Sequence, residues 1–252
     1  MLLLRKRKYG ISFITIWYAK EPVKESGVMQ YREALFQPES NLVEFETLLS
    51  DLTESEEEMI AKFSKNCRYE VRRAAKEAIE TEMKTGANLT QKDIEEFCDF
   101  FVEFWASKGV EYKEADNLKQ ELADYAAQNA FAITSVSIAG KKILYHTYVV
   151  GDDCVRLYHS ASLYRQDDAV PQSLVGMANR YLHKEDMLYF KQMGKTQYDW
   201  GGAGKTEDVI NITKFKESFG GTPVTYYDFT QVNGWKAKLV ILLSGLKRRL
   251  RR

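Results

Sequence analysis

The stretch from Asp199 to Thr206 reads D-W-G-G-A-G-K-T and differs by one residue from a phosphate-binding loop. That loop needs a glycine where Asp199 stands, because the backbone curls there so that its N–H groups converge on phosphate. A carboxylate would repel phosphate, and too few residues follow Thr206 for the doubly wound domain that accompanies such a loop. We therefore expect Gly201 and Gly202 either to let a substrate approach the backbone or to form a tight turn.

Four side chains could move a proton or stabilise developing charge, and they are Lys216, His146, His159 and Asp199. A histidine can accept the proton of an amine near neutral pH, but a lone histidine in a strand can equally be structural. Asp199 could orient a ligand or take up a proton. Lys216 could face a substrate or be an exposed lysine that balances Glu217.

Period-two alternation sorts the side chains of the central strands onto two faces. On one strand, one face should carry Leu144, His146, Tyr148 and Val150. On the next strand, one face should carry Arg156, Tyr158, Ser160 and Ser162. Ligands of open sheets sit where strands end and feed a crossover helix, so this strand end is a candidate substrate site. The predicted substrate-binding residues are Tyr158, Ser160, Tyr164, Arg165, Trp200, Gly201, Gly202, Phe215, Arg68 and Arg72.

A basic stripe follows one side of the helix expected over 66–79, formed by Lys65, Arg68, Arg72 and Lys76. The stripe could hold the phosphate of a sugar nucleotide, a lipid pyrophosphate or a tRNA, or it could be a solvated face paired with the acidic run 54–58. Binding is favoured, because those acids already suit the N-terminal dipole of their own helix.

The elements that position these residues follow from periodicity and from caps. Strands are expected over 11–19, 28–36, 43–52 and 79–83, with helices over 54–64, 66–79, 91–109 and 118–129. Three strands then begin at Ala132, Lys141 and Cys154. A helix over 172–193, a strand over 196–200, a helix over 211–219, a strand over 223–232 and a helical tail from 235 complete the order. This order predicts an α/β (α+β) fold, with a mixed sheet flanked by helices.

Composition excludes several classes of protein. Lysine plus arginine and aspartate plus glutamate both number 36 in 252 residues, so the net charge gives no bulk attraction to nucleic acid or membrane. Cys67, Cys98 and Cys154 lack a C-x-x-C spacing, which argues against a zinc site or disulfides and for a reducing cytoplasm. The N-terminus lacks a signal-peptide pattern, and the longest apolar run, 239–243, is far below the roughly 18 residues that span a bilayer.

Four motifs follow one another between Ser64 and Gly221. They are S-K-N-x-R-x-x-V-R-R-A over 64–74, Y-x-x-A-S over 158–162, Y-D-x-G-G over 198–202 and F-K-x-S-F-G-G over 215–221. In this combination the chain resembles the Fem-type aminoacyltransferases and the related GNAT-like acyltransferases of cell-envelope and polysaccharide gene sets. Ordered motifs are more specific together than any one alone.

The resemblance implies a GNAT-like fold, in which Lys216 faces the acyl donor or an acceptor phosphate and assists charge development. Full-length Fem-type enzymes carry two GNAT-like halves, so this chain should have a reduced N-terminal half with a helical segment over 1–130. A C-terminal GNAT-like domain over 131–235 and a basic helical tail over 236–252 should follow.

The function expected from this resemblance is transfer of an acyl or aminoacyl group to an amine of a cell-envelope or polysaccharide precursor. Acyl-CoA or aminoacyl-tRNA would be the donor substrate, with no tightly bound cofactor and no metal. No R/Q-x-x-G-x-G/A run precedes the helix at Pro171, which leaves the donor open. The alternative is a non-catalytic GNAT-like module that binds saccharide, phosphate or RNA.

The tail from 235 mixes leucines with basic residues, which suits the negative end of a helix dipole and also an interfacial amphipathic helix. Docking of the leucines on the protein's own sheet is favoured, because a single short amphipathic helix is a marginal anchor. We expect a cytoplasmic protein, with weak, salt-sensitive contact to the inner membrane surface as the option that the tail leaves open.

Overall fold

The structure is a computed structural model that describes residues 1–38, 42–163, 170–204 and 207–249. The chain forms two compact units: unit 1 joins Met1–Thr47 to Val224–Arg252, and unit 2 comprises Leu48–Pro223. The chain therefore leaves unit 1, builds unit 2 and returns. These units do not coincide with the segments predicted in sequence order, because the last strand pairs back with a strand near the N-terminus.

Unit 1 is built around four strands in the order β1 (Leu2–Lys8), β2 (Ile11–Trp17), β3 (Gly27–Ala34) and β10 (Thr222–Asn233). The β2–β3 pair is parallel, and the pairs on either side of it are antiparallel. Its core is aromatic and aliphatic, with the rings of Tyr31 and Phe229 stacked at 4.4 Å. The sequence did not predict β1, whose second half is a charged run typical of an edge strand.

Helix α7 (Trp235–Arg249) confirms the predicted helical tail and packs on β2 and β3. The expected docking of its leucines is wrong for those that the structure describes. Ala237 and Val240 make the contact with Ile11 and Val28, whereas Leu239, Leu242 and Leu243 are exposed. Side chains spaced by about 100° cannot all face one sheet, and the smaller ones allow the closer approach.

Unit 2 carries a mixed sheet with the order β4 (Leu42–Asp51, which begins in unit 1), β9 (Gln197–Asp199), β8 (Cys154–Ser162), β7 (Lys141–Val150), β6 (Phe131–Ile138) and β5 (Ile79–Thr85). The β8–β9 pair is parallel and the other neighbours are antiparallel. The predicted mixed α/β fold class is thereby confirmed.

The helices of unit 2 are α1 (Glu56–Ala61), α2 (Lys65–Ala74), α3 (Gln91–Ser107), α4 (Ala115–Ala126), α5 (Gln172–Gln192) and α6 (Glu207–Glu217), with a 3-10 turn over Gly86–Asn88. Ser55 and Thr90 begin α1 and α3 with reciprocal capping boxes, as their sequences indicate. None of the helices within the described ranges combines the length and apolar composition that a bilayer crossing requires.

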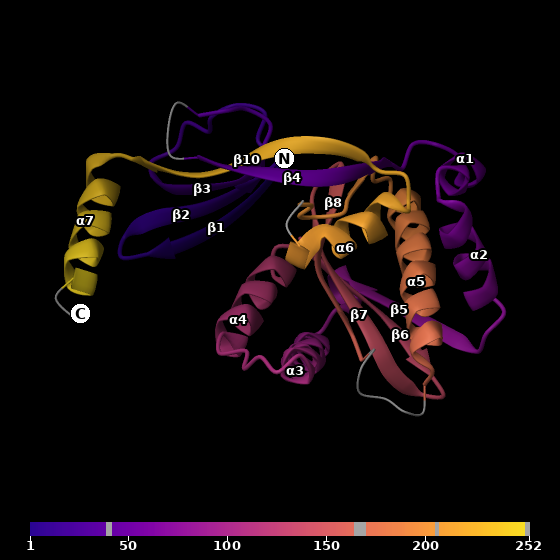
Figure 1. The fold of residues 1–252 in the computed structure, drawn as a ribbon. Helices are drawn as coiled ribbons and strands as arrows, with labels where there is room; N and C mark the ends of the chain where they lie inside the picture. Colours follow the sequence, from indigo (N-terminus) through magenta and orange to yellow (C-terminus); the bar gives the residue numbers. More distant parts are fainter. Residues whose placement is uncertain (39–41, 164–169, 205–206, 250–252) are drawn as a thin grey trace. The chain divides into compact units, whose positions relative to one another are not determined.

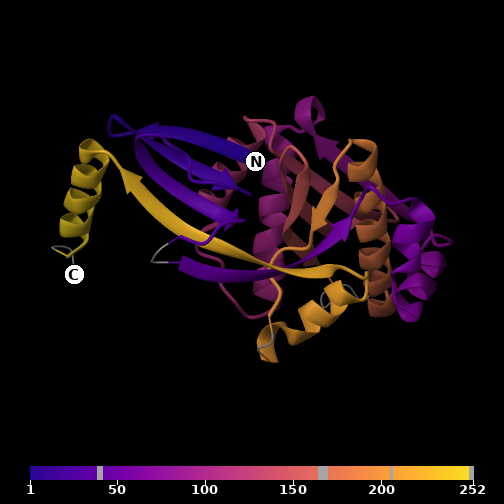
Figure 2. The same cartoon turned by 90° about the horizontal axis from the view of Figure 1, so that it is seen from above.

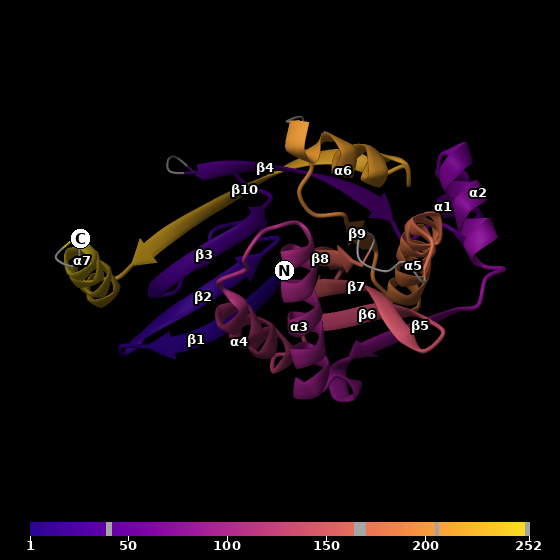
Figure 3. The same ribbon diagram turned by 60° about the horizontal axis from the view of Figure 1, so that its bottom comes forward.

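Alternation along β7 assigns the helices to opposite faces of this sheet, as Figures 1 and 3 show. Tyr145 packs against Phe97 and Phe100 of α3. The neighbouring residue, His146, points the other way and bonds Asp186 of α5. The two layers of helices therefore bury both faces of the central strands, which explains why β7 is almost continuously buried.

Candidate active site

Strands β8 and β9 pair over only three positions. Cys154, Val155 and Arg156 lie opposite Gln197, Tyr198 and Asp199. Beyond Asp199 the chain stays beside β4, because the Trp200 N–H donates to the carbonyl of Leu48 at 3.0 Å. The rest of β8 continues along β7 as far as Ser162. The β8–β9 ladder therefore ends at Arg156 and Asp199, and the carboxyl ends of parallel strands are where ligands bind in open α/β sheets.

A glycine turn closes the end of β9. Gly201 has φ +62°, and a Cβ there would lie 2.7 Å from the carbonyl oxygen of Leu157, so the two backbones meet without room for a side chain. The carboxylate of Asp199 accepts the N–H of Gly201 at 2.8 Å. The predicted tight turn is present, and it also brings the backbone close to β8.

Lys216 reaches this turn from α6. Its Nζ donates to the carbonyl oxygens of Gly201 at 2.8 Å and Gly202 at 2.6 Å, and the residue is 8% exposed. The alternative for Lys216, an exposed lysine that balances Glu217, is therefore wrong. Because burying a charge is costly unless it is paired, the ammonium and two carbonyl dipoles form one tightly held group at the strand end.

A β-bulge changes which side chains of β8 share a face. The register shifts between the pairs Tyr148–Leu157 and Thr147–His159, so Tyr158 is the extra residue. Ser160 lies opposite His146 on the α5 side, whereas Arg156 lies opposite Val149 on the other side. The single face predicted for Arg156, Tyr158, Ser160 and Ser162 is thus wrong, because simple alternation does not survive a bulge.

Arg156 joins the turn as a residue that the sequence reading passed over as a site candidate. Its guanidinium donates to the carbonyl of Leu157 at 3.1 Å, and its Cζ lies 3.4 Å from the Cβ position of Gly201. Arg156 and Asp199 are directly opposite in the parallel register. In the sequence, Arg156 and Asp199 are two charged residues within predicted strands, which was the only signal for this pair. That both are buried, and that they lie opposite each other, follows from the register of the two strands.

His159 is a half-buried ring on the α3 side of β8. Its Nδ1 lies 2.9 Å from the Thr147 hydroxyl, and the ring packs against Phe97 and Phe101. Burial, and secondarily the charge of Arg156, lowers the pKa of His159 to about 4. The ring is therefore neutral near pH 7 and only a weak proton acceptor.

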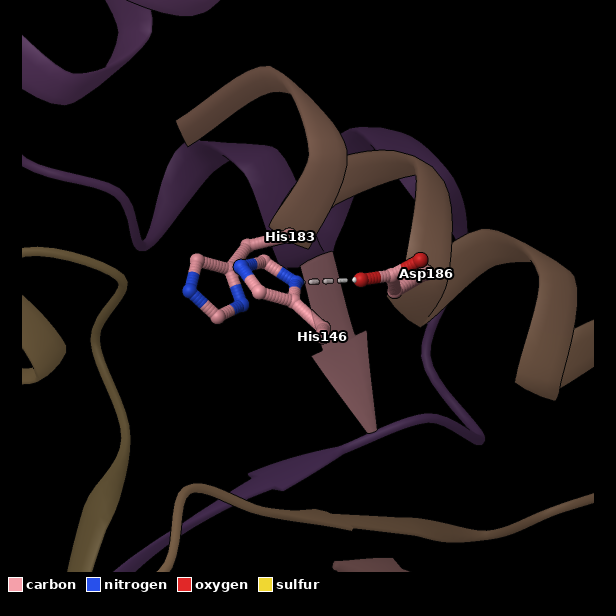
Figure 4. A group of neighbouring side chains, drawn as sticks. All are labelled: His146, His183 and Asp186. Carbon is pink, nitrogen blue, oxygen red and sulfur yellow. Dashed lines mark hydrogen bonds and ion pairs between the residues drawn. The ribbon is translucent and has the colours of Figure 1, made fainter. Parts of the chain in front are cut away.

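His146 belongs to a buried hydrogen-bond network on the α5 side, drawn in part in Figure 4. Its Nδ1 lies 2.8 Å from Asp186 Oδ2, and its Nε2 lies 2.8 Å from Asn179 Oδ1. Asp186 Oδ2 also accepts the hydroxyls of Tyr148 at 2.5 Å and Thr134 at 3.2 Å. This carboxylate therefore has three partners, which is what a buried charge requires.

The network continues through Tyr198 to His183. The Tyr148 and Tyr198 hydroxyls are 2.9 Å apart, and His183 Nδ1 lies 2.9 Å from the Tyr198 hydroxyl. Burial first, and then the nearby charges of His146, Lys216 and Arg180, holds the pKa of His183 well below its usual range. Burial, reinforced by the charge of Asp186, raises the pKa of both tyrosines well above theirs.

His146, His183 and Asp186 are also the group of side chains that could hold a metal ion among the described residues, with ligand atoms within 4.8 Å of one another. Both ring nitrogens of His146, the Oδ2 of Asp186 and the Nδ1 of His183 are already hydrogen-bonded to protein. A metal would have to replace these bonds. The geometry therefore fits a closed proton-sharing network better than a metal centre.

The remaining predicted contacts are distributed over the molecule. Trp200 is fully buried in the core and donates its indole N–H to Ser50 at 2.9 Å, and Phe215 packs on the ring of His183. Tyr158 donates to Glu121 at 2.7 Å, and Ser160 is exposed. Tyr164 and Arg165 lie outside the described residues.

The basic stripe of α2 is only partly a free surface for anions. Arg68 donates to the carbonyls of Ala61 at 2.7 Å and Phe63 at 2.6 Å, so it satisfies the end of α1. It lines a shallow depression together with Glu56 and Glu57, whose carboxylates oppose phosphate. Arg72 is exposed and remains the better candidate for an anion contact.

The fold is similar to that of a Fem-type protein, FemX, so the predicted resemblance is confirmed for the fold alone. No protein-family model matches the sequence, and no curated protein matches it. The crystal structure of FemX superposes with a TM-score of 0.59 at 11% identity, covering 79% of this chain and 63% of that one. This chain therefore spans less than two thirds of the FemX chain.

Two further structures are similar. A conserved protein of unknown function from Bacteroides thetaiotaomicron gives a TM-score of 0.50 at 10% identity, covering 76% of this chain and 62% of its own. The C-terminal domain of a putative lysylphosphatidylglycerol synthetase from Agrobacterium fabrum gives 0.49 at 14% identity, covering 85% and 71%. At these identities the likeness to FemX and to the Bacteroides thetaiotaomicron protein establishes the fold alone.

Proposed function

We propose that this protein is a transferase that moves an acyl or aminoacyl group to an amine, and that the transfer takes place at the carboxyl end of β9, where its pairing with β8 ends. The observation that carries the proposal is the turn at Gly201, where Lys216, Asp199 and Arg156 converge on one stretch of backbone. Burying three charged groups is unfavourable in itself, and such arrangements concentrate at functional sites.

The chemistry needs little more than orientation. The amine nitrogen attacks the acyl carbonyl, a C–N bond forms, and the thioester or ester bond of the donor breaks so that its sulfur or oxygen leaves with a proton. Lys216 is a positioning residue here, because its two hydrogen bonds fix the carbonyls of Gly201 and Gly202. His159 is a weak base. It therefore suits accepting a proton from the acidic ammonium that forms when the amine attacks, rather than from the free amine.

The donor proposed is an acyl-CoA or an aminoacyl-tRNA, bound as a substrate. The acceptor proposed is the amine of a cell-envelope or polysaccharide precursor, either a saccharide or a lipid-linked one, as the Fem-type resemblance implies. Arg72 is the residue of the α2 stripe that we assign to a phosphate of either substrate, since it is exposed on that helix.

One observation favours a second candidate, the non-catalytic module that binds saccharide, phosphate or RNA. His146, Asp199 and Lys216 are each less than 9% exposed, and each has hydrogen-bond partners within the protein. Because these three candidate catalytic side chains are already hydrogen-bonded within the protein, a protein of this fold could bind a ligand without performing transfer.

Transfer of label from acetyl-CoA or aminoacyl-tRNA to amino-sugar acceptors by the purified full chain tests the two candidates. Transfer that is reduced by Lys216→Met supports the transferase. No transfer with either donor, together with saturable binding of saccharide or RNA, overturns it in favour of the binding module.

A further inference from the structure

Helix α7 exposes an apolar stripe on the side that faces away from its own sheet. Ala237 and Val240 pack on the sheet, and a step of about 100° per residue turns the next set of side chains to the far side. That set has the spacing i, i+4, i+7, i+8 and consists of Trp235, Leu239, Leu242 and Leu243, with exposed fractions of 71, 47, 63 and 51%. A soluble surface rarely gathers large apolar side chains in this way.

Positive charge surrounds the stripe. Lys236 and Lys238 occupy its two flanks by the same helical step and are exposed. The sequence after the stripe, 247–252, reads K-R-R-L-R-R, in a chain whose formal net charge is zero. The described part of the helix therefore combines an apolar strip with a lysine on either side, the pattern of a helix that lies in a membrane interface.

A second exposed aromatic residue lies at the same end of unit 1. Figures 2 and 3 show α7 beside the turn that joins β1 to β2, and Ile11, at the start of β2, belongs to the cluster that holds Ala237. That turn carries Tyr9, 72% exposed, with the Lys8 ammonium 5.2 Å from its ring. Tyrosine and tryptophan prefer the headgroup level, where one end of each ring is apolar and the other wet.

We propose that this end of unit 1, consisting of α7 and the Tyr9 turn, binds the surface of an anionic lipid bilayer. The leucines enter the boundary between headgroups and acyl chains, and Lys236 and Lys238 contact lipid phosphates. Anionic lipid complements the cations, whereas the apolar face of a protein partner would leave them unpaired. This property is independent of the proposed transfer.

Flotation of the full chain with vesicles tests the proposal. Vesicles of phosphatidylglycerol and phosphatidylcholine should bind the protein, vesicles of phosphatidylcholine alone should bind it much less, and high salt should weaken the binding. Leu239→Ser combined with Leu242→Ser should weaken it at least about tenfold, on the scale of the apolar area lost. Ile212→Ser, at a 52% exposed position in unit 2, is the matched control and should have no effect.

Brominated lipid reports directly on insertion. Of the other three tryptophans, Trp17 and Trp200 are buried and Trp105 is half-buried in unit 2. Quenching of tryptophan fluorescence in the wild type that is lost in Trp235→Phe would therefore locate α7 in the interface. Equal binding to neutral and anionic vesicles, or full binding by the double leucine variant, would overturn the proposal. So would a lipid-free dimer, seen by sedimentation, that the same double variant abolishes, since the stripe would then be a self-association surface.

Discussion

The ammonium of Lys216 lies 2.8 Å from the carbonyl oxygen of Gly201, fifteen positions earlier in the chain. This bond ties α6 to the turn that ends β9, and the neighbouring carbonyl of Gly202 accepts a second bond. Because Gly201 also approaches Leu157 of β8 too closely for a side chain, one lysine holds the turn that packs against β8.

Lys216→Met should lower the turnover of acyl transfer at least about tenfold, which corresponds to ~1.4 kcal/mol of transition-state stabilisation. Methionine keeps the apolar stem and removes the two hydrogen bonds, so the turn loses its fixed geometry. Steady-state kinetics with the labelled donor measures the effect. Lys214→Met on the exposed side of α6 is the control, and wild-type turnover in a folded Lys216→Met protein would remove Lys216 from the site.

The stretch D-W-G-G-A-G-K-T should not bind nucleoside triphosphates. The N–H of Gly201, which a phosphate loop would offer to a phosphate, is taken by the Asp199 carboxylate at 2.8 Å. Calorimetric titration with ATP and with GTP should give no saturable heat. Saturable binding that disappears in Lys205→Ala would show that this interpretation of the glycines is mistaken.

Tyr148→Phe should lower the free energy of unfolding by about 1–3 kcal/mol, because Asp186 loses a donor while remaining buried. Urea denaturation measures the change, and Tyr69→Phe, at a 53% exposed position, is the matched control.

Treatment with EDTA should leave the melting temperature unchanged. A lower melting temperature after EDTA treatment would contradict the hydrogen-bonded network of His146, His183 and Asp186 and would indicate a bound metal ion.

The stability of the protein should decrease as the pH falls from about 6.5 to about 4, in part through His159. Folding lowers the pKa of this ring from 6.5 to about 4, so over this window the unfolded chain binds a proton that the folded chain does not. The contribution is at most about 3.5 kcal/mol, over about 2.5 pH units at about 1.4 kcal/mol per pH unit. Urea denaturation across the window should give a flatter dependence for His159→Asn than for the wild type. If the free energy of unfolding depends on pH in the same way for His159→Asn and for the wild type, His159 is not buried as a neutral ring.

Local structure and the fold class could be predicted from the sequence. Capping residues such as Ser55 and Thr90, the helical spacing of Phe97 and Phe101, and the alternation along β7 depend on neighbours a few positions away. The ordered motifs around Tyr158, Tyr198 and Phe215 led to the resemblance to Fem-type proteins, which the likeness to FemX confirms for the fold alone. The glycine turn was likewise predictable, because Gly201 requires a positive φ that its own local sequence favours.

Only the tertiary structure decided which polar groups meet and which apolar ones stay outside. His183 and Asp186 occur within an ordinary helical pattern, and they join His146 because α5 crosses β7 at that point. The bulge at Tyr158 moved Arg156 to the other face, and Ala237 rather than the leucines met the sheet under α7. Register, bulges and helix rotation are set by contacts between distant segments, where every buried polar atom must find a partner, and the periodicity of a single segment does not contain that information.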